Sequence, residues 1–142
     1  MQPLQDRDAE NTLEEGTPVM AYTFLGIDHV QLAAPPGCES EARAFYGEIL
    51  GLLEIEKPEN LKPRGGVWFQ CGSQQIHIGV QPDFRPATKA HPAFALRDLP
   101  SLRQRLRDHH VAIVEDEPLP GATRFYVADP FGNRLEFLEP TG

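Results

Sequence analysis

The chain has 142 residues, 40% of them hydrophobic, which is enough for one substantial core, so a single domain is expected. Its formal net charge is −8, and its 13 basic residues are scattered among 21 acidic ones rather than clustered as nucleic-acid phosphates require, so nucleic acid is excluded as a partner. No segment reaches the roughly 20 apolar residues that cross a membrane, and no basic and apolar leader opens the chain, so we expect a cytoplasmic protein that binds a small molecule and no membrane.

The first 22 residues are polar and more acidic than the remainder. Their net charge is −4, half of the total, and Gly16 and Pro18 interrupt regular structure. We therefore expect a flexible acidic arm over residues 1–22, followed by a single domain over residues 23–142.

A strand, a helix and three short strands are predicted between residues 23 and 80. The first strand covers about 24–33 and ends at the turn Pro35-Pro36-Gly37. The helix begins near Glu39 and ends before Gly51. Its apolar residues share one face at helical spacing and are Ala42, Phe45, Tyr46, Ile49 and Leu50. The later strands are predicted at 53–56, 67–71 and 75–80.

The same βαβββ order recurs between residues 91 and 140. Asp98 is a typical N-cap for a helix whose inner face is apolar, and His109 and His110 follow that helix. The residues on its inner face are Leu99, Leu102 and Leu106. The strands are predicted at 93–96, 111–114, 122–128 and 133–138. A duplicated unit of this kind predicts two sheets around one cavity, with a helix on the outer face of each sheet.

Three histidines and one glutamate stand at polar positions of otherwise apolar strands. They are His29, His77, His91 and Glu136. His29 and His91 are 62 residues apart, and His77 and Glu136 are 59 apart, so the four occupy the first and last strands of both halves. A lone histidine in a strand is most often a structural residue, but alternation directs all four toward the cavity. Neutral imidazoles and a carboxylate suit a divalent metal ion: zinc, nickel, iron or manganese.

Four segments resemble the vicinal oxygen chelate superfamily, which includes glyoxalase I, extradiol dioxygenases, methylmalonyl-CoA epimerase, fosfomycin-modifying enzymes and bleomycin-binding proteins. The segments are IDHV (27–30), AFYGEILGL (44–52), HPAFALRDL (91–99) and RFYVADPFGNRLEF (124–137). The match covers nearly all of residues 23–140. It implies an α+β fold in which paired βαβββ modules, 23–80 and 91–140, form a curved, partly open barrel-like sheet around one cavity.

The resemblance implies that His29, His91 and Glu136 bind the metal, because the metal ligands of the family come from the corresponding strands. His77 stands where glyoxalase I has a fourth ligand, so it is either a fourth ligand or an acid/base group. The resemblance further implies Glu136 or His77 as the proton carrier. The residues expected to orient or surround the substrate are Tyr126, in a catalytic role, with Arg124, Trp68 and Phe131.

The chemistry implied by the resemblance is binding of two neighbouring substrate oxygens to the metal, which favours a lyase or isomerase. An extradiol dioxygenase is one alternative: Phe125-Tyr126, Asp129-Pro130 and Glu136 match the end of the extradiol signature, but Glu117-Pro118-Leu119 stands where that signature has its histidine. A non-catalytic drug-binding protein of the bleomycin-resistance type is another, and the intact ligand set favours an enzyme over it. A homodimer is expected, and the site lies either within one chain or across two.

Overall fold

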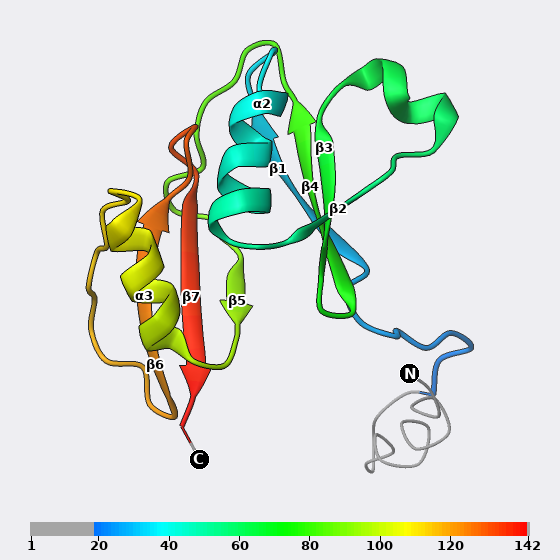
Figure 1. Ribbon diagram of the computed structural model, residues 1–142. Helices are drawn as coiled ribbons and strands as arrows, with labels where there is room; N and C mark the ends of the chain where they lie inside the picture. The colour runs from blue at the N-terminus through cyan, green and yellow to red at the C-terminus, as the bar shows by residue number, and fades with distance from the viewer. Residues whose placement is uncertain (1–18, 142) are drawn as a thin grey trace.

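A computed structural model describes residues 19–141 and shows two small sheets accompanied by a few helices (Figure 1). The strands are β1 (His29–Ala34), β2 (Leu53–Ile55), β3 (Val67–Cys71), β4 (Gln74–Val80), β5 (Ala93–Ala95), β6 (Ala122–Ala128) and β7 (Arg134–Pro140). The first sheet has the order β1-β4-β3-β2 and the second has the order β5-β7-β6. β1 runs parallel to β4 and β5 runs parallel to β7, while the other neighbours are antiparallel. The predicted α+β class is confirmed.

The helix predicted after β1 is present, but most of it is wider than an α-helix. α2 (Glu39–Ala42) continues directly into the π-helix η1 (Arg43–Ile49). The amide of Leu50 donates to the carbonyl of Phe45, five residues back, at 2.9 Å, as a π-helix requires. Phe45 and Tyr46 are buried, so the predicted apolar face does face the core.

Two further helices complete the described chain. The 3₁₀-helix η2 (Glu59–Arg64) lies in the turn-rich segment between β2 and β3. α3 (Leu99–Asp108) begins where predicted, because the Asp98 side chain accepts a hydrogen bond from the Ser101 amide. Among residues 19–141, no helix has the length and hydropathy needed to span a membrane.

Each sheet has an apolar face and a polar face. In β4, the buried Ile76 and Ile78 face one way and His77 faces the other. β7 repeats this pattern, with Glu136 on the polar face opposite Tyr126 of β6. The alternation predicted from the sequence therefore sets which side chains share a face.

The helix α2–η1 lies between the two sheets and α3 covers the second sheet (Figure 1), and buried residues of these helices and of both sheets form one core. The ring of Tyr46 in η1 lies 5.8 Å from that of Phe69 in β3, and its hydroxyl donates to Asp129, just after β6, at 2.6 Å. From α3, the Arg105 guanidinium donates to two carbonyls of η1 at 2.7 and 2.8 Å. Because the apolar faces of both sheets belong to this shared core, the two polar faces point away from it.

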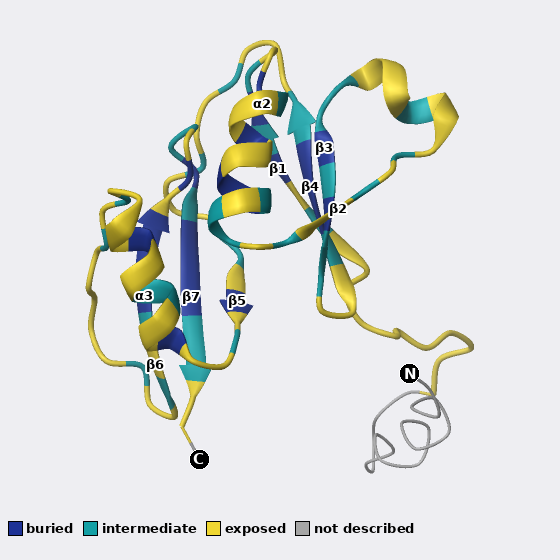
Figure 2. Cartoon of the chain, viewed as in Figure 1, coloured by how far each residue is buried: buried dark blue, intermediate teal, exposed yellow. Residues whose placement is uncertain are grey.

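The segment before β1 exposes many apolar side chains. Figure 2 shows residues 19–27 as an exposed stretch that runs away from the sheets. Its exposed large apolar residues are Val19, Met20, Tyr22, Phe24, Leu25 and Ile27. The other large hydrophobic residues with this exposure, among those described, are Leu53 and Val114, one beside the polar face of each sheet.

The first strand starts later than predicted. β1 begins at His29 rather than near residue 24, because its pairing with β4 starts at His29 and Gln75 and Gly26 has a φ of 130°. Of the arm predicted over residues 1–22, residues 1–18 lie outside the described part of the chain.

Two predictions in the second half also need correction. The strand predicted at 111–114 is reduced to one bridge, in which Val114 exchanges two hydrogen bonds with Tyr126 at 2.8 and 2.9 Å. Residues 115–118 form no bridge to β6, and the next bridge joins Leu119 to Ala122 at the start of that strand. His91, expected within a strand, lies two residues before β5.

Candidate functional site

The polar face of the first sheet carries a stack of three aromatic rings. His29 on β1 lies over His77 on β4, with ring centroids 4.2 Å apart and planes inclined by 17°. Trp68 on β3 stacks on His77 at 3.7 Å and 3°. The stack follows from the register, because β4 lies between β1 and β3 and Trp68 pairs directly with His77.

Hydrogen bonds fix which ring nitrogens of this pair carry a proton. His29 Nδ1 lies 2.9 Å from the Asp28 carboxylate, which can only accept, so Nδ1 donates and Nε2 keeps its lone pair. His77 Nε2 lies 2.9 Å from the Gln75 side-chain carbonyl, so its Nδ1 keeps the lone pair. Burial and the neighbouring His29 lower the pKa of His77, which keeps that ring neutral. Each ring therefore offers one nitrogen to a cation.

The polar face of the second sheet carries the other two predicted residues as a pair. His91 Nε2 lies 3.0 Å from Glu136 Oε1, and His91 Nδ1 lies 2.8 Å from the carbonyl of Lys89. That carbonyl can only accept, so Nδ1 carries a proton and the Nε2 of a neutral His91 has a lone pair aimed at a carboxylate oxygen. Two acceptors in this position require a cation between them, either a proton or a metal ion. A carbonyl that orients the far nitrogen is typical of metal-binding histidines.

The Arg124 side chain holds the remaining oxygen of this carboxylate and also binds Tyr126. Arg124 Nη1 donates to Glu136 Oε2 at 3.3 Å and to the hydroxyl of Tyr126 at 3.0 Å. The guanidinium of Arg134 lies 3.9 Å from the centre of the Tyr126 ring. These contacts fix Oε2 of the buried Glu136 and leave Oε1 directed toward His91.

The structure brings the four predicted ligands together as two pairs rather than as one group. Within residues 19–141 of a single chain, no three or more His, Cys, Asp or Glu side chains are placed to hold a metal ion. The first pair, His29 with His77, lies on the polar face of the first sheet, and the second pair, His91 with Glu136, lies on that of the second. Because both faces point away from the shared core, each chain presents the two pairs separately.

The residues predicted to surround the substrate divide in the same way. Trp68 belongs to the first half, and Arg124 and Tyr126 belong to the second. Phe131, in the turn after β6, is half-buried and packs against the hydrophobic core.

The residues that orient the ligands were not predicted from the sequence. Asp28 and Gln75 bind the ring nitrogens of the first pair, and the Lys89 carbonyl binds the second. Asp28 could have been found as a carboxylate next to a candidate ligand. A backbone carbonyl leaves no signal in the sequence.

The Asp-Pro-Phe-Gly-Asn run forms a buried structural network rather than part of either pair. Asp129 accepts hydrogen bonds from the amides of Phe131 and Asn133 at 2.9 and 2.8 Å and from the Asn133 side chain at 3.1 Å. The Tyr46 hydroxyl adds a fourth. Burial and the nearby Asp129 raise the pKa of Tyr46 well above its usual value, so the hydroxyl stays a donor. This network joins the first helix to the second sheet.

Comparison with known families gives one match over most of the chain. The model of the Glyoxalase/Bleomycin resistance protein/Dioxygenase superfamily matches residues 26–137. A search of curated proteins gave no significant match.

Solved structures with the same fold include one close relative. A glyoxalase family protein from Bacillus anthracis is 55% identical, covers 86% of this chain and 100% of its own, and has a TM-score of 0.83. Lactoylglutathione lyase from Agrobacterium tumefaciens is 20% identical over 83% of this chain and 96% of its own, with a TM-score of 0.66. The fosfomycin resistance protein FosX from Listeria monocytogenes is 18% identical over 84% and 94%, with a TM-score of 0.64. The last two show a common fold only.

Proposed function

This chain belongs to the Glyoxalase/Bleomycin resistance protein/Dioxygenase superfamily, and we propose that it is a divalent-metal-dependent lyase or isomerase whose active site is completed by two copies of the chain. The observation that carries the proposal is the His91–Glu136 pair, in which a ring nitrogen and a carboxylate oxygen face each other at 3.0 Å. A divalent cation satisfies both atoms at once.

The donor set fits such a cation only when two half-sites meet. The first half-site, His29 and His77, offers two nitrogens, and the second, His91 and Glu136, offers one nitrogen and one oxygen. Neither reaches the three ligands that a catalytic zinc site typically has. In a two-fold symmetric dimer, the first half-site of one chain meets the second half-site of its partner, and two equal sites result. Zinc, nickel, iron and manganese all suit these donors.

The exposed segment before β1 supports a homodimer. Its six large apolar side chains lie directly before His29, so a partner chain that completes the site also passes close to this segment. Leu53 and Val114 add exposed apolar surface beside the polar faces themselves. Covering these residues on a second copy removes apolar area from water, which drives association.

Polar substitutions in this segment should therefore weaken the dimer. Changing both Phe24 and Leu25 to serine should raise the dissociation constant of the dimer at least about a hundredfold, because each buried side chain of this size contributes about 1.5–3 kcal/mol. Sedimentation equilibrium over a range of protein concentrations measures this constant. Ala21→Ser, in the same segment, is the matched control and should change it little. A dissociation constant that is equal in the double variant and the control argues against this interface.

The chain's own residues then position and move protons. When bound, the divalent ion supplies polarisation of two neighbouring oxygens of a small substrate. Glu136 is the proton carrier that the contacts favour: Arg124 holds its Oε2, and Oε1, once released from the cation that it shares with His91, could accept a proton from a carbon next to a carbonyl and return it to the adjacent carbon. Arg124 and Tyr126 orient the substrate oxygens.

Metal content tests the proposal directly. The purified full-length protein, dialysed against EDTA and then against each of zinc, nickel, iron and manganese, should retain about one ion per chain. His29→Ala and Glu136→Gln should each reduce this content about tenfold or more, since each removes a ligand from every site. His109→Ala removes an exposed histidine outside both pairs and serves as the control.

Other outcomes decide between the remaining functions. A wild-type protein that retains none of the four metals rules out a metal-dependent enzyme and favours a drug-binding protein. Bound iron together with cleavage of catechols identifies a dioxygenase. Bound zinc or nickel with activity toward a hemithioacetal identifies a lyase.

A further inference from the structure

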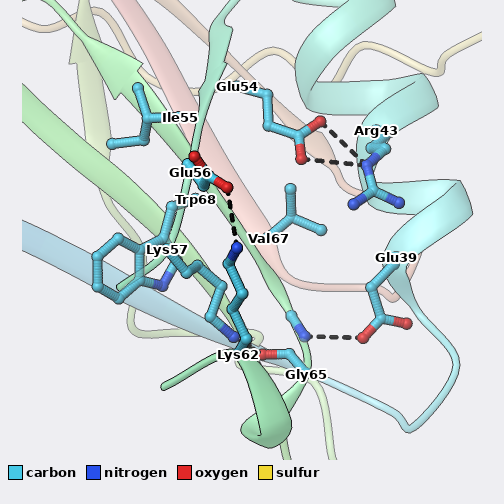
Figure 3. Close-up of a pocket in the computed structure, with 11 residues that line it drawn as sticks. Glu39, Arg43, Glu54, Ile55, Glu56, Lys57, Lys62, Gly65, Val67 and Trp68 are labelled. Carbon is cyan, nitrogen blue, oxygen red and sulfur yellow. Dashed lines mark hydrogen bonds and ion pairs between the residues drawn. The ribbon is translucent and has the colours of Figure 1, made fainter. Parts of the chain in front are cut away.

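A tight turn between η2 and β3 is held from both sides. The amide of Gly66 donates to Glu39 Oε2 at 2.7 Å, as Figure 3 shows by a dashed line, and the Lys57 ammonium donates to the carbonyl of Gly65. The bond from Gly66 lowers the pKa of Glu39, which keeps that carboxylate charged. A Cβ atom on Gly66 would overlap the carbonyl of Ile78, so the turn lies directly against β4. This turn fixes the position of Arg64, the residue before it.

The fixed turn borders a cavity of about 240 Å³ beside the first half-site. Its polar lining comes from Gln31, Lys57 and Arg64, and Trp68 forms part of its apolar wall. Two cations and no acidic residue line it, although the whole chain carries a net charge of −8. No residue between 19 and 141 forms an ion pair or hydrogen bond with the Arg64 guanidinium or the Gln31 amide.

The neighbouring cavity in Figure 3 differs in its charges. There Arg43 pairs with Glu54, and Lys62 pairs with Glu56. Of these two cavities, only the one beside Arg64 therefore has positive charges that no acidic residue of its lining neutralises.

The cavity adjoins the proposed metal ligands on the same face of the first sheet. Gln31 follows His29 by two residues on β1, and Gly79 follows His77 by two on β4. Gly79 leaves room for the Gln31 amide, whose nitrogen lies 2.6 Å from where a Cβ atom would stand. Trp68 connects the two places, because its ring stacks on His77 and also lines the cavity.

We propose that this cavity binds a carboxylate group of the substrate, which makes the substrate a small organic acid. The inference rests on the proposed function, since the other end of that substrate is the part that reaches the His29–His77 pair. A guanidinium binds a planar carboxylate through two parallel hydrogen bonds, and the Gln31 amide adds a third donor. The cavity is smaller than the roughly 300 Å³ of pockets for drug-sized ligands, so it holds one end of a substrate rather than all of it.

Binding of a matched acid and amide to the metal-free dimer tests this site. Trp68 is the only tryptophan in the chain and lines this cavity, so tryptophan fluorescence reports on binding next to it. Phenylacetate should change the emission with a saturable curve, and phenylacetamide, its uncharged analogue, should bind at least about tenfold more weakly. Arg64→Gln should weaken phenylacetate about tenfold and leave phenylacetamide unchanged, and Gln31→Met should weaken phenylacetate to a smaller degree.

Arg107→Gln is the control, because Arg107 is an exposed arginine on α3 outside the cavity. Equal affinities of the acid and the amide for the wild type, or equal effects of the two arginine variants, overturn the inference. Because metal is absent, the result is independent of the proposed metal site: selective acid binding in a protein that never retains metal upholds the cavity and refutes the enzyme. A protein that retains metal without selectivity for the acid upholds the metal site and refutes the carboxylate site.

Discussion

Two variants that cannot bind metal should restore metal binding when their subunits are mixed. One variant carries His29→Ala and His77→Ala, and the other carries His91→Ala and Glu136→Gln. In the homodimer of either variant, every site lacks one of its two halves, so neither should retain metal. The reason is that each chain holds its two pairs on faces directed away from a common core.

A mixed dimer differs from both parents because its two sites are unequal. One site combines the two altered halves, while the other combines the two intact halves. If subunits exchange at random, half of the dimers are mixed, and about a quarter of the wild-type metal content should return. Elemental analysis of the dimer fraction after co-refolding and metal addition measures this recovery.

As the control, each variant is refolded alone in the same way. Its homodimers should stay metal-free. A site formed within one chain predicts a different outcome, since no mixing can then repair either variant. Zero recovery from dimers shown to be mixed would place the site within a single chain.

The largest loss of stability is expected at Asp129. Asp129→Ala should lower the free energy of unfolding by about 3 kcal/mol or more, because it removes the acceptor of three donors in the turn, two of them in buried hydrogen bonds, and of the Tyr46 hydroxyl. Tyr46→Phe removes only one of these bonds and should cost about 1–3 kcal/mol. Urea denaturation at one fixed protein concentration measures both values, since the stability of a dimer depends on concentration.

Asp83→Ala provides the comparison for a carboxylate without this role. Asp83 is exposed, so its removal should change the free energy of unfolding by no more than about 0.5 kcal/mol. If Asp129→Ala is no more destabilising than Asp83→Ala, the buried network does not hold the two halves together.

Local patterns predicted most of the fold. Alternation correctly placed His77 and Glu136 on polar faces, because the period of a strand depends only on neighbouring residues. Asp98 likewise identified the start of α3 through a bond to a residue three positions away. The π-helical turns of η1 were missed, since the apolar spacing of that segment also fits an α-helix.

The arrangement of the two halves could not be read from the sequence. It depends on contacts such as the bond between Tyr46 and Asp129, which are 83 residues apart, and no local pattern encodes such a pairing. The same holds for the pairing of His29 with His77, which requires β1 to lie beside β4. The strand predicted at 111–114 failed for a related reason, because only tertiary pairing decides where a strand ends.

The core shared by the two sheets bears on the order in which this protein folds, pairs and takes up metal. Since that core separates the two pairs in each chain, a newly made subunit can fold completely and, on the proposed function, still have no coordination sphere to fill. The proposal then requires that metal loading follow subunit pairing, so that a scarce ion is not trapped by unassembled chains. At low expression, the fraction of active protein would be limited by encounters between subunits rather than by the supply of metal.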